Sequence, residues 1–429
     1  MNCQRRRSFV KKAFIGCAGF ISLGCLPFVR GVATATGNPG PGRGAPGSSS
    51  GSSLRAPGEG GLQGDFAGGD MGRGESAGGH SGRGDVQQAQ GTGGTEAMFY
   101  RKLDNNLVQC QLCPHRCKIE PGNSGFCRVR QNRRGTLYSM VYGRPCTVDT
   151  GPIEKAPLYH FVPGHRRLCL ATVGCNLRCR YCHNWHISQR APGEVRELRM
   201  SASQIVDEAA RHGVRSISFT YTEPTIFYEY VHDISRLAKE RGLKTSIVSN
   251  GYINPEPMRR LLPYLDAVKI DLKAFSDSFY REISSARLDP VLQTLKLLRE
   301  EDAFFEIVCL VVPTLNDDPG EIRMMCEWIA GNLGRDVPVH FTRFAPSYRL
   351  TNLPPTPVRT LEAAIGTALG SGLQYVYIGN VPGHMNNSTY CGRCDERLIH
   401  RTHFTVLENN IENGKCRYCG YAIRGIWEV

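Results

Sequence analysis

Residues 168–182 read Leu-Cys-Leu-Ala-Thr-Val-Gly-Cys-Asn-Leu-Arg-Cys-Arg-Tyr-Cys, an apolar run that passes through one glycine into a cysteine-rich loop. A short apolar run bounded by glycine is typical of a buried strand. From here to residue 378, similar runs alternate with helical patterns of apolar residues. The expected strands are Leu168–Val173, Ser216–Phe219, Thr245–Val248, Ala267–Ile270, Phe304–Val312, Val339–Phe344 and Tyr375–Ile378. The expected helices are 202–212, 225–241, 289–301, 319–333 and 358–370.

This alternation predicts an α/β fold, because strands joined by helices over short connections pair in parallel. Six or seven such units in about 210 residues favour a full or partial TIM-like (β/α) barrel over an open sheet. Cysteine-rich extensions precede and follow this core. In such a barrel the chemistry gathers at the C-terminal ends of the strands, so residues that follow each strand are the first candidates for a site.

Composition limits how much of the chain folds. Residues 37–94 hold 21 of the 48 glycines and few large apolar side chains, so they cannot bury enough surface to offset their ordering entropy. We therefore expect a linker over 36–96, a Cys-rich segment over 97–160, a core over 161–385 and a C-terminal segment over 386–429. A hydrophobic content of 41% excludes a polytopic membrane protein.

The net charge of +13 is distributed unevenly. Residues 1–35 contribute +6 and residues 36–96 contribute −2, which leaves +9 on the remaining 333 residues. That excess suits an anionic or nucleotide-like ligand, but an evenly solvated basic surface explains it better. Nucleic-acid binding does not follow from it.

The N-terminus has the pattern of an export signal. Arg6-Arg7-Ser8-Phe9-Val10-Lys11 precedes an apolar run from Ala13 to Val29 and then Ala33-Thr34-Ala35. A basic start, an apolar stretch and an A-x-A site resemble a twin-arginine signal over residues 1–35. An uncleaved membrane anchor is the alternative, because 17 apolar residues approach the length of a span. Cytoplasmic location is the other alternative.

The loop Cys175–Cys182, called here the Cys loop, carries three cysteines spaced C-x3-C-x2-C. Three thiolates at this spacing can ligate three irons of a 4Fe–4S cluster and leave the fourth open. An open iron can chelate the amino and carboxyl groups of S-adenosylmethionine (SAM), and an electron from the cluster can then cleave the C–S bond to give a 5′-deoxyadenosyl radical. A structural zinc loop is disfavoured because no fourth ligand lies nearby. The arrangement resembles the radical SAM superfamily.

This resemblance implies roles for further residues. It implies that Tyr181 contacts adenine and that Thr222 and Glu223 hold the SAM amino group, as a Gly-Gly-Glu-like motif does in the family. It also implies that Ser249 and Asn250 contact the ribose or carboxylate. Asp271 and Lys273 end the fourth expected strand and complete the predicted SAM-binding edge, with Cys175, Cys179 and Cys182 as the catalytic metal ligands. Taken singly, each is also an ordinary polar residue of a loop.

Eight more cysteines form two accessory groups. The N-terminal Cys set consists of Cys110, Cys113, Cys117 and Cys127, and the C-terminal Cys set consists of Cys391, Cys394, Cys416 and Cys419. Such clusters indicate metal ligation rather than disulfides. The N-terminal Cys set is a complete ligand group for Zn²⁺ or for a second iron–sulfur cluster. Zn²⁺ is expected at the C-terminal Cys set, with a rubredoxin-like iron site as the alternative.

Residues 98–429 extend the resemblance. The segments Cys-Gln-Leu-Cys-Pro-His-Arg-Cys at 110–117, 151–161, 221–227 and 340–344 look like those of the radical SAM enzymes of the AmmeMemoRadiSam system, related to pyruvate formate-lyase-activating enzymes. Ala345 departs from that pattern, because histidine is common there. The resemblance implies an electron donor such as flavodoxin or ferredoxin, and Memo-like and AMMECR-like proteins as partners.

A zinc-ribbon nucleic-acid binder is one alternative, but such ribbons serve equally to dock proteins. Three further functions remain open at this point. The first is reductive cleavage of SAM followed by hydrogen abstraction from an unidentified substrate. The second is activation of a glycyl-radical enzyme, in which the substrate is a partner protein. The third is an electron-transfer protein, although a simple relay has no need of Thr222, Glu223 or Asn250 at the strand ends.

Overall fold

The computed structural model describes residues 94–428. The expected signal over 1–35 and nearly all of the expected linker over 36–96 lie outside these residues. Within the described range, a search for helices long and apolar enough to span a membrane finds none.

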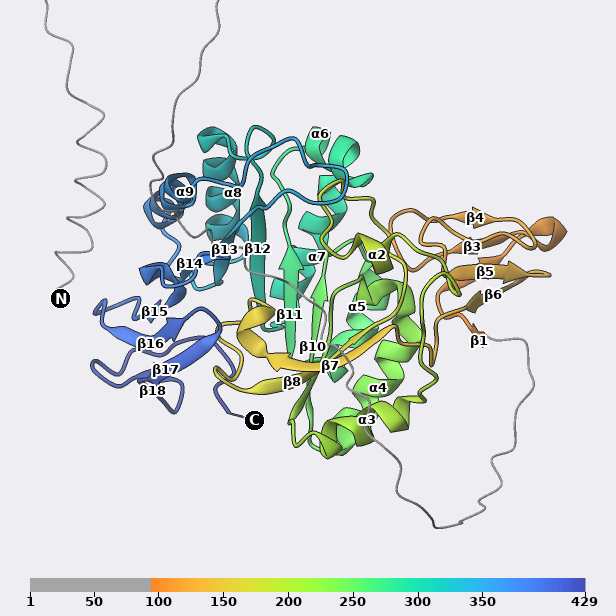
Figure 1. The fold of residues 1–429 in the computed structure, drawn as a ribbon, viewed down its shortest axis with the longest axis horizontal. Helices are drawn as coiled ribbons and strands as arrows, with labels where there is room; N and C mark the ends of the chain where they lie inside the picture. The colour runs from red at the N-terminus through yellow and green to blue at the C-terminus, as the bar shows by residue number, and fades with distance from the viewer. Residues whose placement is uncertain (1–93, 429) are drawn as a thin grey trace, which may run out of the picture. The chain divides into compact units, whose positions relative to one another are not determined.

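One eight-stranded sheet forms the centre of the described chain (Figure 1). Its strands follow one another in chain order from β7 to β14; β8 to β14 run parallel, and β7 pairs antiparallel with β8. The bounds are β7 (Thr147–Pro152), β8 (Arg166–Ala171), β9 (Ser216–Phe219), β10 (Lys244–Ser249), β11 (Ala267–Asp271), β12 (Phe305–Val311), β13 (Val339–Arg343) and β14 (Val376–Gly379). No ladder joins β14 to β7 within residues 94–428, so the barrel is partial.

All seven strands predicted from the apolar runs are present, and none is displaced at either end by more than two residues. The antiparallel strand β7 was not predicted, because Thr-Val-Asp-Thr-Gly-Pro has no apolar run. The expected barrel class is confirmed.

Helices connect successive parallel strands. Their bounds are α3 (Ala202–Arg211), α4 (Tyr228–Glu240), α5 (Pro255–Leu261), α7 (Leu288–Glu300), α8 (Pro319–Asn332) and α9 (Val358–Gly370), with short turns α2 (Trp185–Ser188), η3 (Pro224–Phe227), α6 (Asp277–Phe279) and η5 (Tyr280–Ser284). Local sequence sets where they begin. Ser201 and Gln204 form a reciprocal capping box at the start of α3, and the Asp318 carboxylate accepts a bond from the Glu321 N–H at the start of α8.

The Cys-rich N-terminal segment forms two small antiparallel sheets, β2-β3-β4 and β1-β6-β5. Their strands are β1 (Thr95–Glu96), β2 (Tyr100–Lys102), β3 (Val108–Cys110), β4 (Lys118–Ile119), β5 (Arg130–Arg133) and β6 (Thr136–Ser139). A buried ion pair joins this segment to the barrel, because Arg130 Nη1 lies 2.9 Å from Glu229 Oε1 of α4 and both side chains are almost inaccessible.

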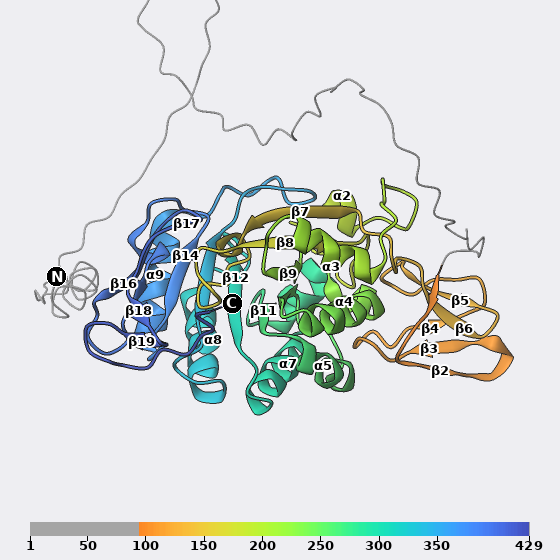
Figure 2. The same cartoon turned by 90° about the horizontal axis from the view of Figure 1, so that it is seen from below.

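The C-terminal segment contains a three-stranded sheet and a hairpin. Their strands are β15 (Thr389–Tyr390), β16 (Arg397–Thr402), β17 (Thr405–Asn409), β18 (Ile411–Glu412) and β19 (Lys415–Cys416). Residues of this segment contact the chain near the N-terminal ends of β12 and β14, since Arg424 pairs with Asp302 and Tyr421 bonds to Gln374. Figure 2 shows the N- and C-terminal segments on different sides of the barrel.

A buried polar network lies at this N-terminal end of the strands. The Glu306 carboxylate accepts bonds from His340 Nε2 at 2.6 Å and from the His160 N–H at 2.7 Å. His160 Nε2 in turn lies 2.6 Å from the Tyr377 hydroxyl. Arg401 of β16 reaches the same region and donates to the Tyr159 carbonyl at 2.7 Å. Every member lies at the end of the strands opposite to the Cys loop. We therefore interpret the network as structural rather than catalytic.

Candidate functional site

The Cys loop leaves β8 at the C-terminal edge of the sheet, where the βα-barrel rule places chemistry. Gly174 makes the turn into the loop with a φ of +94°. A Cβ atom here would stand 2.6 Å from Val129 Cγ1 and 2.9 Å from the Cys127 carbonyl oxygen. Only glycine fits, because both the backbone angle and the close approach of the N-terminal segment exclude a side chain.

Each thiol of the Cys loop has a polar neighbour. The Leu177 N–H lies 3.4 Å from Cys175 Sγ, and Ser188 Oγ lies 3.2 Å from Cys182 Sγ. Cys179 Sγ is 3.5 Å from Ser284 Oγ at the end of η5. Burial raises the pKa of the Cys175 thiol, and the nearby Glu223 carboxylate raises it further. Thiolates at this position therefore need a compensating cation, which iron supplies.

Glu223 is buried at 2% exposure after β9, and its carboxylate is bonded within the chain. Oε1 accepts from Ser249 Oγ at 2.8 Å and from the Thr225 N–H at 3.0 Å, while Oε2 accepts from the Asn250 N–H at 2.8 Å. Burial raises the pKa of Glu223, and these N–H groups offset part of the increase. The carboxylate thus joins the ends of β9 and β10.

Asn250 connects this carboxylate to the Cys loop. Its Nδ2 donates to Asn176 Oδ1 at 2.8 Å and lies 3.9 Å from Cys175 Sγ. Asn176 Nδ2 donates in turn to the Tyr252 carbonyl at 2.8 Å. The loop and two strand ends therefore form one hydrogen-bonded unit, which holds Cys175 in a defined position.

The remaining predicted residues lie on the same edge. Thr222 is buried and donates to the Thr172 carbonyl at 2.8 Å. Burial opposes ionisation of Asp271, but Lys269 and Lys273 outweigh it and lower the pKa of Asp271 to about 2. Burial likewise opposes the charged form of Lys273, but Asp271 outweighs it and raises the pKa of this ammonium group.

Tyr181 is the polar group of this edge that lacks a partner. Its side chain is 5% exposed, and its hydroxyl is buried with no hydrogen bond among the described residues. A buried hydroxyl without a partner is costly, so it points to a ligand that completes it. Three thiols without a fourth, a satisfied carboxylate beside them and one unpartnered hydroxyl fit a cluster with an open iron and a polar ligand bound against it.

Comparison with known proteins agrees with this geometry. The profile of the Radical SAM superfamily matches residues 170–326, which include the Cys loop and the strand ends just described. An uncharacterized protein of Methanocaldococcus jannaschii is 44% identical over 330 residues, covering 76% of this chain and 98% of the relative. This chain belongs to the radical SAM superfamily.

Two further similarities are more distant. A pyruvate formate-lyase-activating enzyme of Clostridium pasteurianum is 29% identical over 193 residues, covering 44% of this chain and 77% of the relative. The crystal structure of a radical SAM methyltransferase from Sphaerobacter thermophilus has a TM-score of 0.42 at 15% identity, covering 54% of this chain and 71% of that one. The family profile and the sequence relatives show a radical SAM protein related to pyruvate formate-lyase-activating enzymes, and the family implies a 4Fe–4S cluster and SAM.

Sequence reasoning missed several residues of the site. Asn176 and Ser284 contact the radical SAM cysteines or their loop, and Tyr252 holds Asn176. Asn176 lies inside the Cys loop, so its position alone was a usable signal. Ser284 is the last residue of the π-helical turn η5, and no local pattern marks it as a neighbour of Cys179.

The four cysteines of the C-terminal Cys set lie close together in the structure. The four Sγ atoms all lie within 4.8 Å of one another. Cys391 Sγ is 3.6 Å from Cys419 Sγ, and Cys394 Sγ is 3.7 Å from Cys416 Sγ. Sulfur atoms about 2.3 Å from one tetrahedral ion stand about 3.8 Å apart, so this set fits a single metal ion.

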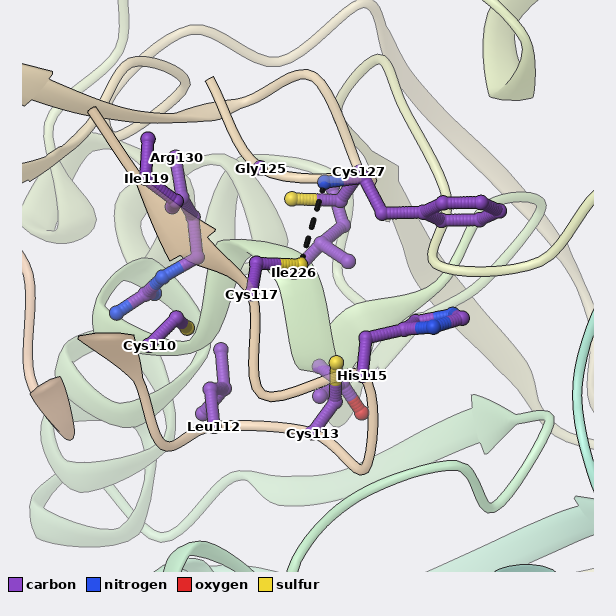
Figure 3. Close-up of a pocket in the computed structure, with 12 residues that line it drawn as sticks. Cys110, Leu112, Cys113, His115, Cys117, Ile119, Gly125, Cys127, Arg130 and Ile226 are labelled. Atoms are coloured by element: carbon purple, nitrogen blue, oxygen red, sulfur yellow. Dashed lines mark hydrogen bonds between the residues drawn. The ribbon is translucent and has the colours of Figure 1, made fainter. Parts of the chain in front are cut away.

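The N-terminal Cys set lines a cavity between the N-terminal segment and the barrel (Figure 3). Cys110 and Cys127 are buried, and Cys113 and Cys117 are half-buried. Apolar walls come from Leu112 and Ile119 of the segment itself and from Ile226 of the barrel. All four predicted ligands therefore face one space.

Proposed function

We propose that this chain cleaves SAM reductively and uses the resulting 5′-deoxyadenosyl radical to abstract hydrogen from a substrate. The observation that carries the proposal is the hydrogen-bonded unit of the Cys loop, Glu223 and Asn250. A loop that only held a structural ion would not need a buried carboxylate shared between two strand ends.

The proposed function gives the Cys loop, Glu223 and Asn250 different roles. Cys175, Cys179 and Cys182 would hold the 4Fe–4S cluster, which supplies an open iron and one electron when bound. Glu223 holds the Asn250 backbone and Ser249, so that Asn250 can orient Asn176 and the Cys loop. Direct contact of Thr222 and Glu223 with the SAM amino group stays a prediction, because both side chains bond to the chain itself.

Tyr181, Asp271 and Lys273 would form the remaining contacts with SAM. Lys269 and Lys273 together keep Asp271 ionised, so both signs of charge are present at the strand edge. The unpartnered Tyr181 hydroxyl is free to bond to a ligand. Tyr181 is buried, whereas Asp271 and Lys273 are half-buried and face the open edge where a ligand would enter.

The test is anaerobic reconstitution of the full chain with iron and sulfide, reduction and analysis of SAM products. We expect 5′-deoxyadenosine, and an electron paramagnetic resonance (EPR) signal of the reduced cluster that changes when SAM is added. Glu223→Gln should keep the iron but weaken SAM binding, whereas exposed Glu240→Gln should behave like the native protein. Absence of 5′-deoxyadenosine from fully loaded, reduced protein would refute the proposal.

A glycyl-radical activase is the second candidate, favoured by the similarity to the Clostridium pasteurianum enzyme. In that case the substrate is a glycine C–H bond of a partner protein. Incubation of the reduced, SAM-loaded chain with glycyl-radical enzymes encoded by the same organism would then give a glycyl EPR signal. If SAM is cleaved but no glycyl signal appears, the activase function is excluded and the first function remains.

The accessory assignments are also proposals. We propose Zn²⁺ at the C-terminal Cys set, supported by its tetrahedral spacing, and a flavodoxin- or ferredoxin-type electron donor. Memo-like and AMMECR-like proteins are proposed partners on the family resemblance of residues 98–429. Co-purification from the native organism tests the electron donor and the partner proteins.

Export through the twin-arginine route is proposed from residues 1–35. Replacing Arg6 and Arg7 by lysine keeps the charge and the apolar run, so it separates this route from a simple anchor. The double variant should remain inside the cell while the native chain is exported. Equal distribution of the two forms, with Met1 kept in both, would contradict the twin-arginine signal and leave a cytoplasmic protein, beside its SAM, or an uncleaved anchor.

A further inference from the structure

The two accessory Cys sets differ in how closely their sulfur atoms pack. Within residues 94–428, the C-terminal Cys set is the only group of three or more cysteine, histidine or carboxylate side chains whose ligand atoms all lie within 4.8 Å. The N-terminal thiols do not meet this spacing and instead surround a cavity (Figure 3). A single ion cannot span such a set at bonding distance, whereas an inorganic core of iron and sulfide fills the space between the thiolates.

The surroundings of the cavity suit such a core. Its walls are apolar side chains, and Arg130 lines it with a positive charge. The Phe126 N–H lies 3.4 Å from Cys117 Sγ, which is the kind of N–H···S contact that tunes cluster potential. A cluster with four thiolates carries net negative charge. The Arg130 guanidinium lies beside it, although its charge is shared with Glu229, 2.9 Å from Nη1.

The cavity also touches the Cys loop. The Cys127 carbonyl packs against Gly174, directly before Cys175. His115 Nε2 lies 2.8 Å from the Asn176 carbonyl and donates to it, since that oxygen can only accept. The His115 ring stacks on Phe126 at 4.2 Å between centroids.

A second contact joins the Cys loop to the N-terminal segment at the same place. Arg178 of the Cys loop stacks its guanidinium over the Phe126 ring at 4.2 Å and donates to the Phe126 carbonyl. Thr225 and Ile226, which follow Glu223, form the far wall of the cavity. The two cysteine groups are therefore separated by little more than one layer of side chains.

We propose that Cys110, Cys113, Cys117 and Cys127 hold a second 4Fe–4S cluster, seated against the loop of the first. Four protein thiolates leave no open iron, so this cluster does not bind SAM and serves to carry single electrons. It takes one electron from a donor of the flavodoxin or ferredoxin class and passes one to the cluster at the Cys loop. This role rests on the proposed function, whereas the presence of the cluster does not.

The experiment counts iron, acid-labile sulfide and zinc in the full chain purified without oxygen. A variant with Cys175, Cys179 and Cys182 replaced by alanine should retain about four irons and four sulfides, and a reduced EPR signal that does not respond to SAM. Adding Cys113→Ser to this variant should abolish that signal. Adding Cys146→Ser, a half-buried cysteine outside all three groups, should leave it unchanged.

Two results in the alanine variant would overturn the proposal. One is zinc in place of iron at the N-terminal Cys set, and the other is the absence of any metal that is lost on Cys113→Ser. Retention of metal at the C-terminal Cys set shows that each variant is folded. In the native protein, full reduction should broaden the EPR spectrum because two neighbouring spins interact, and each variant should lose this broadening. If native protein makes no 5′-deoxyadenosine but the iron count holds, the proposed function fails and the second cluster stands.

Discussion

The two accessory Cys sets use the same ligand type but occupy opposite ends of the barrel strands. The N-terminal Cys set faces a cavity beside the Cys loop, at the C-terminal edge where chemistry takes place. The C-terminal Cys set belongs to a segment that packs near the N-terminal ends of β12 and β14. The contrast supports the proposals that the N-terminal Cys set carries electrons and that the C-terminal Cys set holds a structural metal.

Both segments are fastened to the rest of the described chain by a buried arginine–glutamate pair. A single buried ion pair, Arg130 with Glu229, joins the N-terminal segment to α4. The C-terminal segment is held by Arg401, which is fully buried 3.6 Å from Glu154 and donates to Thr389 Oγ1 at 2.8 Å. Its guanidinium also lies over the Tyr159 ring at 4.3 Å.

Removal of metal from the C-terminal Cys set should have the largest effect. Structural Zn²⁺ contributes on the order of 10 kcal/mol to small domains, so Cys416→Ser should unfold β15–β19. Metal analysis should show the loss of about one Zn²⁺ per chain with iron unchanged, and hydrogen exchange should show loss of protection confined to residues 386–428. Loss of iron would instead identify a rubredoxin-like site.

Arg401→Ala should have the next largest effect. It leaves Glu154 buried without its partner, and breaking a buried pair costs about 3–5 kcal/mol. Chemical denaturation monitored by hydrogen exchange across the C-terminal segment measures this cost. Arg397→Ala is the control, because its pair with Glu408 is exposed and should cost less than about 1 kcal/mol. Equal effects of the two variants would contradict the anchoring role of Arg401.

Acid should weaken the same anchor. Burial lowers the pKa of His160 to about 4, and its neutral ring donates from Nδ1 to the Arg424 carbonyl and accepts from Tyr377 at Nε2. An unfolded histidine has a pKa of about 6.5, so the unfolded chain binds a proton that the folded chain excludes. Stability should therefore fall as pH drops from about 6.5 to 4, by up to about 3 kcal/mol.

Titration of neighbouring groups also changes how the free energy of unfolding depends on pH. Burial opposes ionisation of Glu306, but His340 lowers its pKa on balance, which adds to the loss of stability in acid. Burial raises the pKa of Glu154, which contributes the opposite sign. Burial also lowers the pKa of His340, which adds a loss of the same sign as that of His160. His160→Asn removes only the His160 contribution, so unfolding free energies measured between pH 7 and 5 should vary less in this variant. An unchanged slope would assign the acid sensitivity to other groups.

Tyr181→Phe should have the smallest effect on stability and a selective effect on the ligand. It removes a buried hydroxyl that has no partner, so the SAM-free protein should change by less than about 1 kcal/mol. If that hydroxyl bonds to SAM, affinity should fall about fivefold, since one neutral hydrogen bond is worth about 1 kcal/mol. Calorimetry measures both quantities.

The matched control lies at the other end of the barrel. Tyr375 is equally buried but lies before β14, near the C-terminal Cys set. Tyr375→Phe should leave SAM affinity unchanged. A parallel loss of affinity in the two variants would mean that neither hydroxyl contacts SAM directly.

The sequence by itself determined the strands, most of the long helices and the three groups of cysteines. Strand and helix signals are local, because burial of one face repeats every two residues in a strand and about every 3.6 in a helix. The spacing within the Cys loop is local too, since all three thiols lie within eight residues. The small sheets of the N-terminal segment and β7 were missed because their strands are short and largely polar, which leaves no apolar run to mark them.

Only the tertiary structure decided which groups meet. Glu223 and Asn250 are 27 residues apart, Arg130 and Glu229 are 99 apart, and His160 and Glu306 are 146 apart. No periodicity links such positions, because their contact depends on how helices return successive strands to one edge. The difference between the accessory Cys sets was equally invisible in the sequence, where four cysteines predict a metal but not the space between their sulfur atoms. That space depends on the backbone around it, which packing against the barrel sets.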